Sequence, residues 1–523
     1  MLKSFQIAAT TFVLMILFAH VVEARNDDVG ETIFKHEWQP QDPKSPNGDG
    51  LGPVFNAQSC AQCHHQGGHG GGGDLKFNLD LIYSEANTKS EQKHLSNIHP
   101  GFRADNGDFQ SMIVMHRFSL DEEYSHARSA MLAFDGAMSE TQQDAERLQW
   151  GMSTHPLQLV HFAADTPGLR IQRNTPALFG IGLIDKVTLR QLTDVKIETR
   201  SPNVTGSPAI LVNRMADVGR FGWRAQVNSL ESFVAMACAS ELGLENSVQS
   251  QIIDPRAPDY QAPGQDISNT DLMHLVNFVK SLPRPEIVMP EDPELAQHVA
   301  HGRKVFHGVG CTDCHVENRA GIREIYSDLL LHDMGPRLAD PILPAPKRAN
   351  LTVGRLRGAD IRLVDTDQDG AFDMTIFAQS EAGAGAPPVA EGATMIGYYG
   401  GFSPLPPPQE QSFGEVSFSE LWARAKRQER AKKQAELDIP ELAREWRTPP
   451  LWGVASSAPY MHDGRAETIL EAILLHGGEA QDSVNAFLKL TNQEQAMLLD
   501  FMQALQAPRM PKPAVAMTSA SPK

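Results

Sequence analysis

Cys60-Ala-Gln-Cys63-His64 and Cys311-Thr-Asp-Cys314-His315 repeat one pattern at two places and use four of the five cysteines of the chain. The Cys-x-x-Cys-His pattern attaches c-type haem: the two thiols add to the vinyl groups of the porphyrin, and the histidine ligates the iron. A four-cysteine zinc site would have to join pairs about 250 residues apart and leave both histidines unused. Redox dithiols are the other alternative. The pattern predicts two covalently bound c-type haems, with His64 and His315 as proximal iron ligands.

The first residues of the chain are typical of a secretory signal peptide. Lys3 is followed by an apolar stretch from Phe5 to Phe18, and Val22-Glu23-Ala24 resembles a cleavage site with small residues. The apolar stretch is short for a membrane span, although an uncleaved anchor is the alternative. We therefore expect residues 1–24 to be removed, leaving no stable membrane span. This leader predicts a periplasmic location, which agrees with the attachment of c-type haem outside the bacterial cytoplasm.

Length and charge limit the possible partners. The 523 residues leave room for two or three domains with substantial cores. The formal net charge of −18 argues against nucleic acid, whose phosphates demand a basic surface. The same charge would permit the steering of a basic electron-transfer partner. Cys238, the cysteine outside the two motifs, stands between two alanines and is predicted to be a buried packing residue.

Helical periodicity and proline predict a domain boundary between the two motifs. Residues 269–282 carry apolar residues at helical spacing, and Pro283-Arg284-Pro285 ends this helix and forms a linker. A second helix is predicted to begin at Asp292-Pro293-Glu294 and to lead into the second motif. We therefore expect an N-terminal cytochrome c-like haem domain over residues 25–285 and a C-terminal one over residues 286–508.

The C-terminal half also contains a segment of different character. Residues from about 336 to 440 include irregular Gly- and Pro-rich stretches and are predicted to form an insertion in the second haem domain. Within it, residues 365–370 (DTDQDG) resemble the start of a calcium loop, but Ile376 stands where such a loop has Glu, which favours a solvated acidic turn. After it, a capping box at Thr491 begins the predicted closing helix. Residues 509–523 are expected to form a disordered tail.

Several blocks of sequence resemble a known family. They are GLGPVFNAQSC at 50–60, YSDLLLHDMGP at 326–336 and RTPPLWG at 447–453. These blocks resemble the dihaem c-type oxidoreductases that are described as putative peroxidases or thiol oxidoreductases. The block APYMHDGRA at 458–466 is also similar to the matching segment of bacterial dihaem cytochrome c peroxidases and MauG enzymes. The resemblance implies a mainly α fold in which two cytochrome c-like haem domains pack together.

The resemblance also implies a sixth ligand for the second haem. In the peroxidase and MauG families this ligand follows the histidine of the His-Asp-Gly sequence at a fixed distance, and 14 residues after His462 stands His476. A capping box at Thr468-Ile469-Leu470-Glu471 and the pair Gly477-Gly478 place His476 at the end of a short predicted helix. Two histidine ligands would close the iron and suit electron storage. Met334 is the alternative sixth ligand.

The first haem is then implied to carry the chemistry. Ala239-Ser240-Glu241 looks like the peroxidase segment whose glutamate lies over the open haem face, so Glu241 is the implied general acid–base. Burial over a haem should raise its pKa; an exposed helical glutamate is the alternative. Trp223 is the candidate for the tryptophan that lies between the haems in the peroxidases, with a core tryptophan as the alternative. His155 and His161 are candidate sixth ligands of the first haem.

A calcium ion is implied by the same resemblance. The peroxidase relatives hold calcium between their domains with an Asn side chain and backbone carbonyls. Asn174, Ser457 and Pro459 stand at the matching positions, and oxygen ligands of this kind suit calcium.

These features together predict a periplasmic dihaem oxidoreductase of peroxidase type. Peroxide or another small oxidant would react at the His64 haem, and the His315 haem would relay electrons from a donor protein such as a small cytochrome or cupredoxin. Two alternatives stay open: MauG-like oxidation of a residue on a partner protein, and a non-catalytic electron carrier in which both irons are six-coordinate. An open iron site beside Glu241 would separate an enzyme from a carrier.

Overall fold

The computed structural model describes residues 29–508 with gaps, which lie at 85, 87, 104–108, 132–157, 163–165, 194–200, 213–216, 255, 336–337, 341–351, 355–358, 365–372 and 379–443. The predicted signal peptide, the calcium-like loop, the C-terminal tail, His155 and most of the predicted insertion lie outside the described residues. Within the described residues, no helix combines the length and the apolar character that a membrane span requires.

Helices carry or flank the first motif. Ser59 caps the short helix α2 (Cys60–Cys63) by accepting a hydrogen bond from the backbone N–H of Gln62. The helices α8 (Leu230–Glu241) and α9 (Asn269–Ser281) pack in the same core, and α9 buries the apolar residues that predicted it. Shorter helices complete this half: α3 (Lys89–Ile98), α4 (Tyr124–Met131), α6 (Ile181–Ile184) and α7 (Leu189–Thr193).

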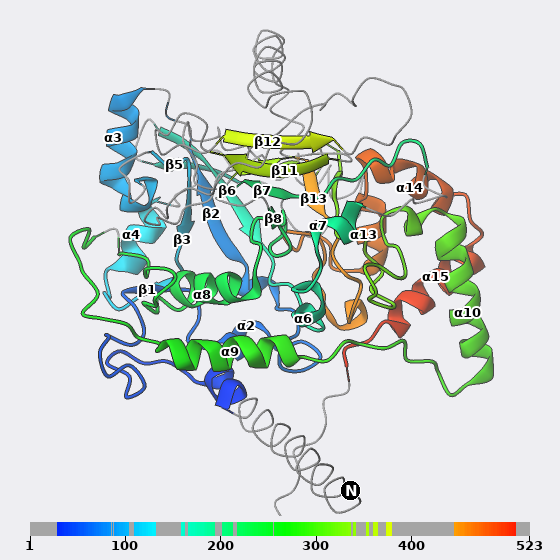
Figure 1. Ribbon diagram of the computed structural model, residues 1–523, viewed down its shortest axis with the longest axis horizontal. Helices are drawn as coiled ribbons and strands as arrows, with labels where there is room; N and C mark the ends of the chain where they lie inside the picture. Colours follow the sequence, from blue (N-terminus) through cyan, green and yellow to red (C-terminus); the bar gives the residue numbers. More distant parts are fainter. Residues whose placement is uncertain are drawn as a thin grey trace, which may run out of the picture.

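A second group of helices surrounds the second motif. The helix α10 (Pro293–Gly308) begins where the sequence predicts, because Asp292 accepts hydrogen bonds from the first-turn N–H groups. It packs on α15 (Asn492–Ala504), which begins with the predicted capping box. The contact is so close that a Cβ at Gly302 would lie 1.8 Å from the carbonyl oxygen of Met497, so only glycine fits there. The short helices α13 (Ile469–Leu475) and α14 (Gln481–Phe487) lie nearby (Figure 1).

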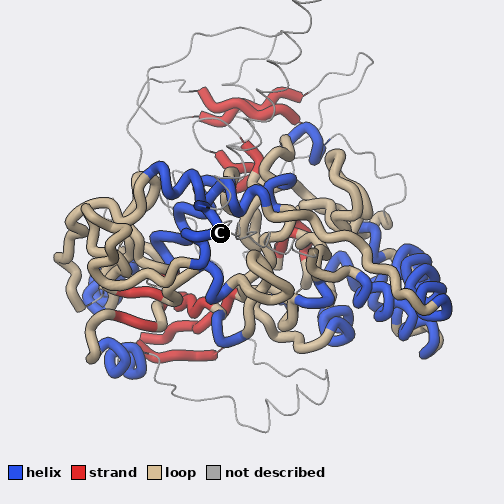
Figure 2. Tube along the Cα trace, turned by 90° about the horizontal axis from the view of Figure 1, so that it is seen from below, coloured by secondary structure: helices blue, strands red, loops and turns tan. Residues whose placement is uncertain are grey.

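The first half also contains an antiparallel sheet that the sequence analysis did not predict. Its strands run in the order β3-β2-β6-β5, with β2 (Leu79–Tyr83) central, and the others are β3 (Met112–Met115), β6 (Thr166–Arg173) and β5 (Gln158–Phe162). Asp80 of β2 is buried and forms ion pairs with Arg128 and Arg170. A charged residue at a buried strand position breaks the apolar alternation that would predict a strand. The sheet and the α10–α15 pair lie at opposite ends of the molecule (Figures 1 and 2).

The remaining strands form small antiparallel pairings. These are β1 (Val54–Phe55) with β4 (Phe118–Ser119), β9 (Leu331–Asp333) with β13 (Glu445–Arg447), β11 (Ala359–Val364) with β12 (Asp373–Ala378), and β7 (Ile210–Val212) between β8 (Asp217–Val218) and β10 (Thr352–Gly354). The strand β10, from the predicted insertion, thus pairs with the N-terminal half.

Two hydrophobic cores correspond to the two motifs. The first contains Cys238, as predicted, and the second contains Phe306 and Phe501. Side chains from beyond residue 286, including Ile325 and Trp452, also belong to the first core, so the two halves share packing. The mainly α fold class agrees with the described helices, whereas the cytochrome c-like character of the two domains stays a prediction. The domain boundaries stay a prediction.

Candidate haem sites

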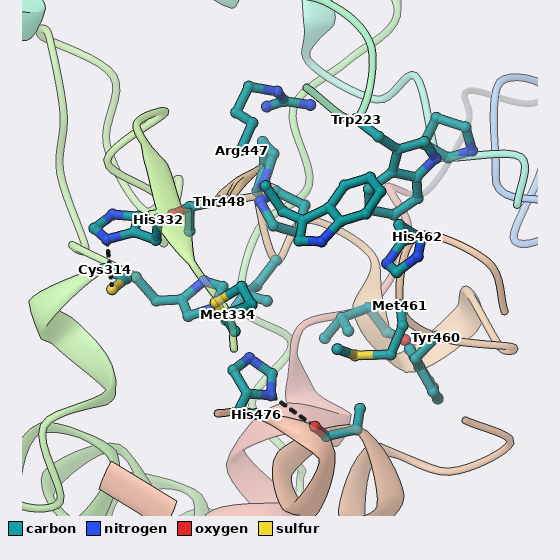
Figure 3. Close-up of a pocket in the computed structure, with 18 of the residues that line it drawn as sticks. Trp223, Cys314, His332, Met334, Arg447, Thr448, Tyr460, Met461, His462 and His476 are labelled. Carbon is teal, nitrogen blue, oxygen red and sulfur yellow. Dashed lines mark hydrogen bonds between the residues drawn. The ribbon is translucent and has the colours of Figure 1, made fainter. Parts of the chain in front are cut away.

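The second motif opens on a largely apolar cavity of about 290 Å³. Cys311, Cys314, His315 and His476 all line it, and Figure 3 shows Cys314 and His476. The ring centroids of His315 and His476 are 6.4 Å apart. With metal–nitrogen bonds of about 2 Å, two imidazoles on opposite sides of one metal would have centroids about 6 Å apart. The two histidines therefore fit the ligation of one haem iron from both faces.

The hydrogen bonds of these histidines leave the correct nitrogen free. Nδ1 of His315 lies 2.8 Å from the carbonyl oxygen of Tyr326, and Nδ1 of His476 lies 2.6 Å from that of Ala472. Because each Nδ1 donates its proton to a carbonyl, Nε2 keeps the lone pair that ligates a metal. Burial lowers the pKa of His315 to about 4, so the ring is neutral near pH 7. Met334, the alternative ligand, lines the same cavity (Figure 3).

The first motif has the same local arrangement at its histidine. Nδ1 of His64 lies 3.0 Å from the carbonyl oxygen of Gly71, and burial lowers the pKa of His64 to about 4. Burial also raises the pKa of Cys60 and of Cys311 to about 12. A redox dithiol needs a thiol of low pKa, so these cysteines lack that property. Among the described residues, no three His, Cys, Asp or Glu side chains form a metal-binding group, so the cysteine pairs do not combine into a zinc site.

Glu241 lies close to the first motif. Its Oε2 accepts a hydrogen bond of 2.7 Å from Nδ2 of Asn56. Burial, followed by the charge of Glu241, raises the pKa of Cys63 to about 12. Burial raises the pKa of Glu241 itself to about 7, although the bond from Asn56 and the charge of Arg117 act in the opposite direction. Glu241 is thus a partly buried, hydrogen-bonded carboxyl group and not an exposed helical glutamate.

Trp223 lines the cavity at the second motif, at the end that is remote from Cys314 (Figure 3). Its Nε1 donates to the carbonyl oxygen of Asn174 at 3.0 Å, and its own carbonyl oxygen accepts a bond from the backbone N–H of Arg447. The side chain is partly exposed to the cavity and is not a core tryptophan. Residues from both halves of the chain therefore hold it.

The three candidate calcium residues, Asn174, Ser457 and Pro459, line the same cavity. The amide nitrogen of Asn174 donates to Asn78 and to the carbonyl oxygen of Gly73. Its Oδ1 is the amide atom that could serve as a ligand. His161, a candidate ligand of the first haem, lies in β5 (Gln158–Phe162), where the structure describes the strand but not the side chains.

The structure also contains a charged cluster that the sequence analysis did not identify. His332 lies between two carboxylates, with Nε2 2.9 Å from Oδ2 of Asp328 and Nδ1 2.7 Å from Oε2 of Glu479. Nδ1 also lies 3.6 Å from Sγ of Cys314 (Figure 3). Burial disfavours the imidazolium, but the charges of Asp328 and Cys314 and their hydrogen bonds hold the pKa of His332 well above its usual value. In the sequence, the Asp-x-x-x-His spacing within residues 326–336 could have indicated the pairing of Asp328 with His332.

Comparisons with known proteins identify a family for part of the C-terminal half of the chain. Residues 432–505 match the model of the family described as "Di-haem oxidoreductase, putative peroxidase". The match includes His476 but neither Cys-x-x-Cys-His motif. No curated protein matches the chain. Among solved structures, a hydrazine synthase of Kuenenia stuttgartiensis is similar at 15% identity, over 74% of this chain and 89% of that one, with a TM-score of 0.24.

Proposed function

We propose that the protein is a periplasmic dihaem c-type oxidoreductase that reduces peroxide at the first motif with electrons relayed through the second. The balanced reaction joins one H₂O₂, two protons and two electrons to give two waters. A small donor protein, such as a cytochrome or cupredoxin, would supply the electrons. The supporting observation is the asymmetry of the two sites: a second histidine faces His315, whereas a carboxyl group with a raised pKa lies beside the first motif.

The second site is suited to hold electrons. A haem bound there would supply reversible one-electron chemistry. His315 and His476 would hold its iron from both faces, so a substrate would find no open position. The apolar cavity wall, which includes Phe306, Ile473 and Leu498, would exclude water from the haem.

The first site is suited to move protons. With a pKa near 7, Glu241 can both accept and release a proton near neutral pH. It would take the proton from one oxygen of the peroxide and give it to the departing oxygen, which leaves as water. The hydrogen bond from Asn56 holds one carboxylate oxygen in place and leaves Oε1 available for this transfer.

The region between the two sites would connect them. Trp223 and Asn174 are joined by a hydrogen bond, and both line the cavity at the second motif. Trp223 lies at the end of this cavity that is remote from Cys314. We include Trp223 in the proposal as the group through which electrons pass to the first site. A calcium ion held by Asn174, Ser457 and Pro459 would fix the same region.

Low-temperature EPR of the fully oxidised, haem-loaded protein tests this proposal. We expect one high-spin ferric signal from the first haem and one low-spin signal from the second. His476→Ala should convert the low-spin signal to high-spin, whereas the matched variant Met334→Ala should leave it unchanged. Two low-spin signals in the wild-type protein would contradict the open first site and favour an electron carrier. Loss of the low-spin signal in Met334→Ala alone would assign the ligand to Met334.

A further inference from the structure

Arg117 and Glu241 are anchored to the same side chain. The backbone N–H of Arg117 donates to Oδ1 of Asn56 at 3.0 Å, and Nδ2 of Asn56 donates to Glu241 at 2.7 Å. Arg117 lies between β3 and β4, more than 120 residues before Glu241 in the chain. After burial, which raises the pKa of Glu241 and of Cys63, the charge of Arg117 lowers both values. The backbone of Arg117 is therefore joined to Glu241 through Asn56, and its charge acts on both Glu241 and Cys63.

Among the residues that the structure describes, no carboxylate forms an ion pair with Arg117. Asp80, the acid with the largest effect on its pKa after burial, is already paired with Arg128 and Arg170. In the described part of the chain, the guanidinium forms one hydrogen bond, from Nη2 to the carbonyl oxygen of Asn78 at 2.7 Å. An arginine side chain has five N–H donors, so most of them stay available to a ligand.

Asn78 holds the guanidinium in a fixed position. Asn78 is 2% exposed; its Oδ1 accepts from Nδ2 of Asn174, and its Nδ2 donates to the carbonyl oxygen of Asp463. Asn174 in turn accepts from Trp223. Hydrogen bonds of backbone and side-chain groups thus link neighbouring residues from Glu241 through Asn56, Arg117, Asn78 and Asn174 to Trp223. The bond to the Asn78 carbonyl positions the guanidinium before an anion binds.

We propose that Arg117 is a second substrate-contacting residue of the first haem site, where its guanidinium donates hydrogen bonds to a small anion. The proposal rests on the proposed function and adds a residue to it. As the O–O bond of peroxide breaks, negative charge develops on the departing oxygen. Arg117 would stabilise that charge until the proton arrives from Glu241. The two electrons come from the donor protein through the second haem, as in the proposed reaction.

Fluoride titration of the oxidised, haem-loaded full chain tests Arg117 without turnover. Fluoride binds an open ferric haem and accepts hydrogen bonds, and the bound form is followed by absorbance. Because a hydrogen bond to a charged group contributes about 1.5–3 kcal/mol, Arg117→Gln should weaken fluoride binding roughly 10- to 100-fold. Arg256→Gln is the matched control: its guanidinium pairs with Asp121 and Glu123 on the surface, so this variant should leave the affinity unchanged.

The outcomes separate this proposal from the proposed function. If the wild-type protein binds fluoride and Arg117→Gln binds it equally well, the role of Arg117 is wrong and the open first site stands. If the wild-type protein shows no fluoride response, both proposals fail. If Arg117→Gln does not load haem, Arg117→Lys decides. Lysine keeps the charge without the planar fork, so a several-fold weaker affinity supports the proposal and an unchanged affinity overturns it.

Discussion

A glutamate accompanies each of the two motifs, and the two glutamates are in opposite electrostatic states. Burial raises the pKa of Glu241 to about 7, with one neutral amide as its hydrogen-bond partner. Glu479 is also partly buried, but the His332 imidazolium and the N–H and O–H groups of Thr205 hold its pKa at about 2. Identical attachment motifs therefore stand in two different environments. The partner of the carboxyl group, and not the motif, decides whether a site exchanges protons or holds a fixed charge.

The largest expected effect concerns the mobile proton at the first site. Glu241→Gln keeps the hydrogen-bonding shape but cannot accept a proton, so the rate of peroxide reduction should fall about 100- to 10,000-fold. In the wild-type protein the rate should decline as the pH falls below about 7, because the carboxylate that accepts the proton becomes protonated. The variant should lack this limb. Stopped-flow measurement of peroxide consumption between pH 5 and 9 checks both statements.

The control for Glu241 is its counterpart at the second site. Glu479→Gln should leave the pH dependence of peroxide consumption in place, because Glu479 stays ionised throughout that range. Full peroxide reactivity in Glu241→Gln would remove the acid–base role and abolish the functional contrast between the two sites.

The next effect concerns the fixed charges at the second site. His332→Gln removes the cation between Asp328 and Glu479 and leaves two buried carboxylates without it, which should cost about 3–5 kcal/mol of stability. Because folding raises the pKa of His332, its contribution is complete below about pH 6.5 and is lost as the pH rises through the folded value. Because folding lowers the pKa of Glu479, its contribution is present above about pH 4.5 and is lost as the pH falls towards 2.

Denaturant unfolding of the wild-type protein and the variant across this pH range checks the prediction. The wild-type protein should be most stable between about pH 4.5 and 6.5 as far as this cluster is concerned, and the variant should lose the decline on the alkaline side. Equal stability of the two proteins at pH 6 would mean that His332 does not neutralise the two acids.

Local patterns in the sequence predicted the parts of the fold that depend on neighbouring residues. The capping boxes at Thr468 and Thr491 and the aspartate N-cap of α10 were all confirmed, because each needs contacts only three residues away. The structure places His476, the residue that the family spacing selected, beside His315. The role of His476 as a ligand stays a prediction.

The parts that the sequence did not predict depend on distant residues. The central strand β2 was missed because Asp80 interrupts its apolar alternation, and its partners Arg128 and Arg170 come much later in the chain. His332 and Glu479 are 147 residues apart, and Arg117 meets Asn56 across 61 residues. A polar residue whose partner is so far away gives no local pattern. The His332 cluster and the contact of Arg117 with Asn56 therefore became visible only in the folded chain.

The smallest expected effect concerns the connection between the two sites. Trp223→Phe removes the hydrogen bond to Asn174 and should cost about 1 kcal/mol of stability. Trp452→Phe is the matched control, because its Nε1 forms an equivalent bond to the carbonyl oxygen of Glu324 at 2.9 Å. If Trp223 carries electrons between the sites, only Trp223→Phe should slow the reoxidation of a pre-reduced second haem by peroxide. Equal slowing in both variants would reduce Trp223 to a packing residue, and the two sites would then exchange electrons by another route.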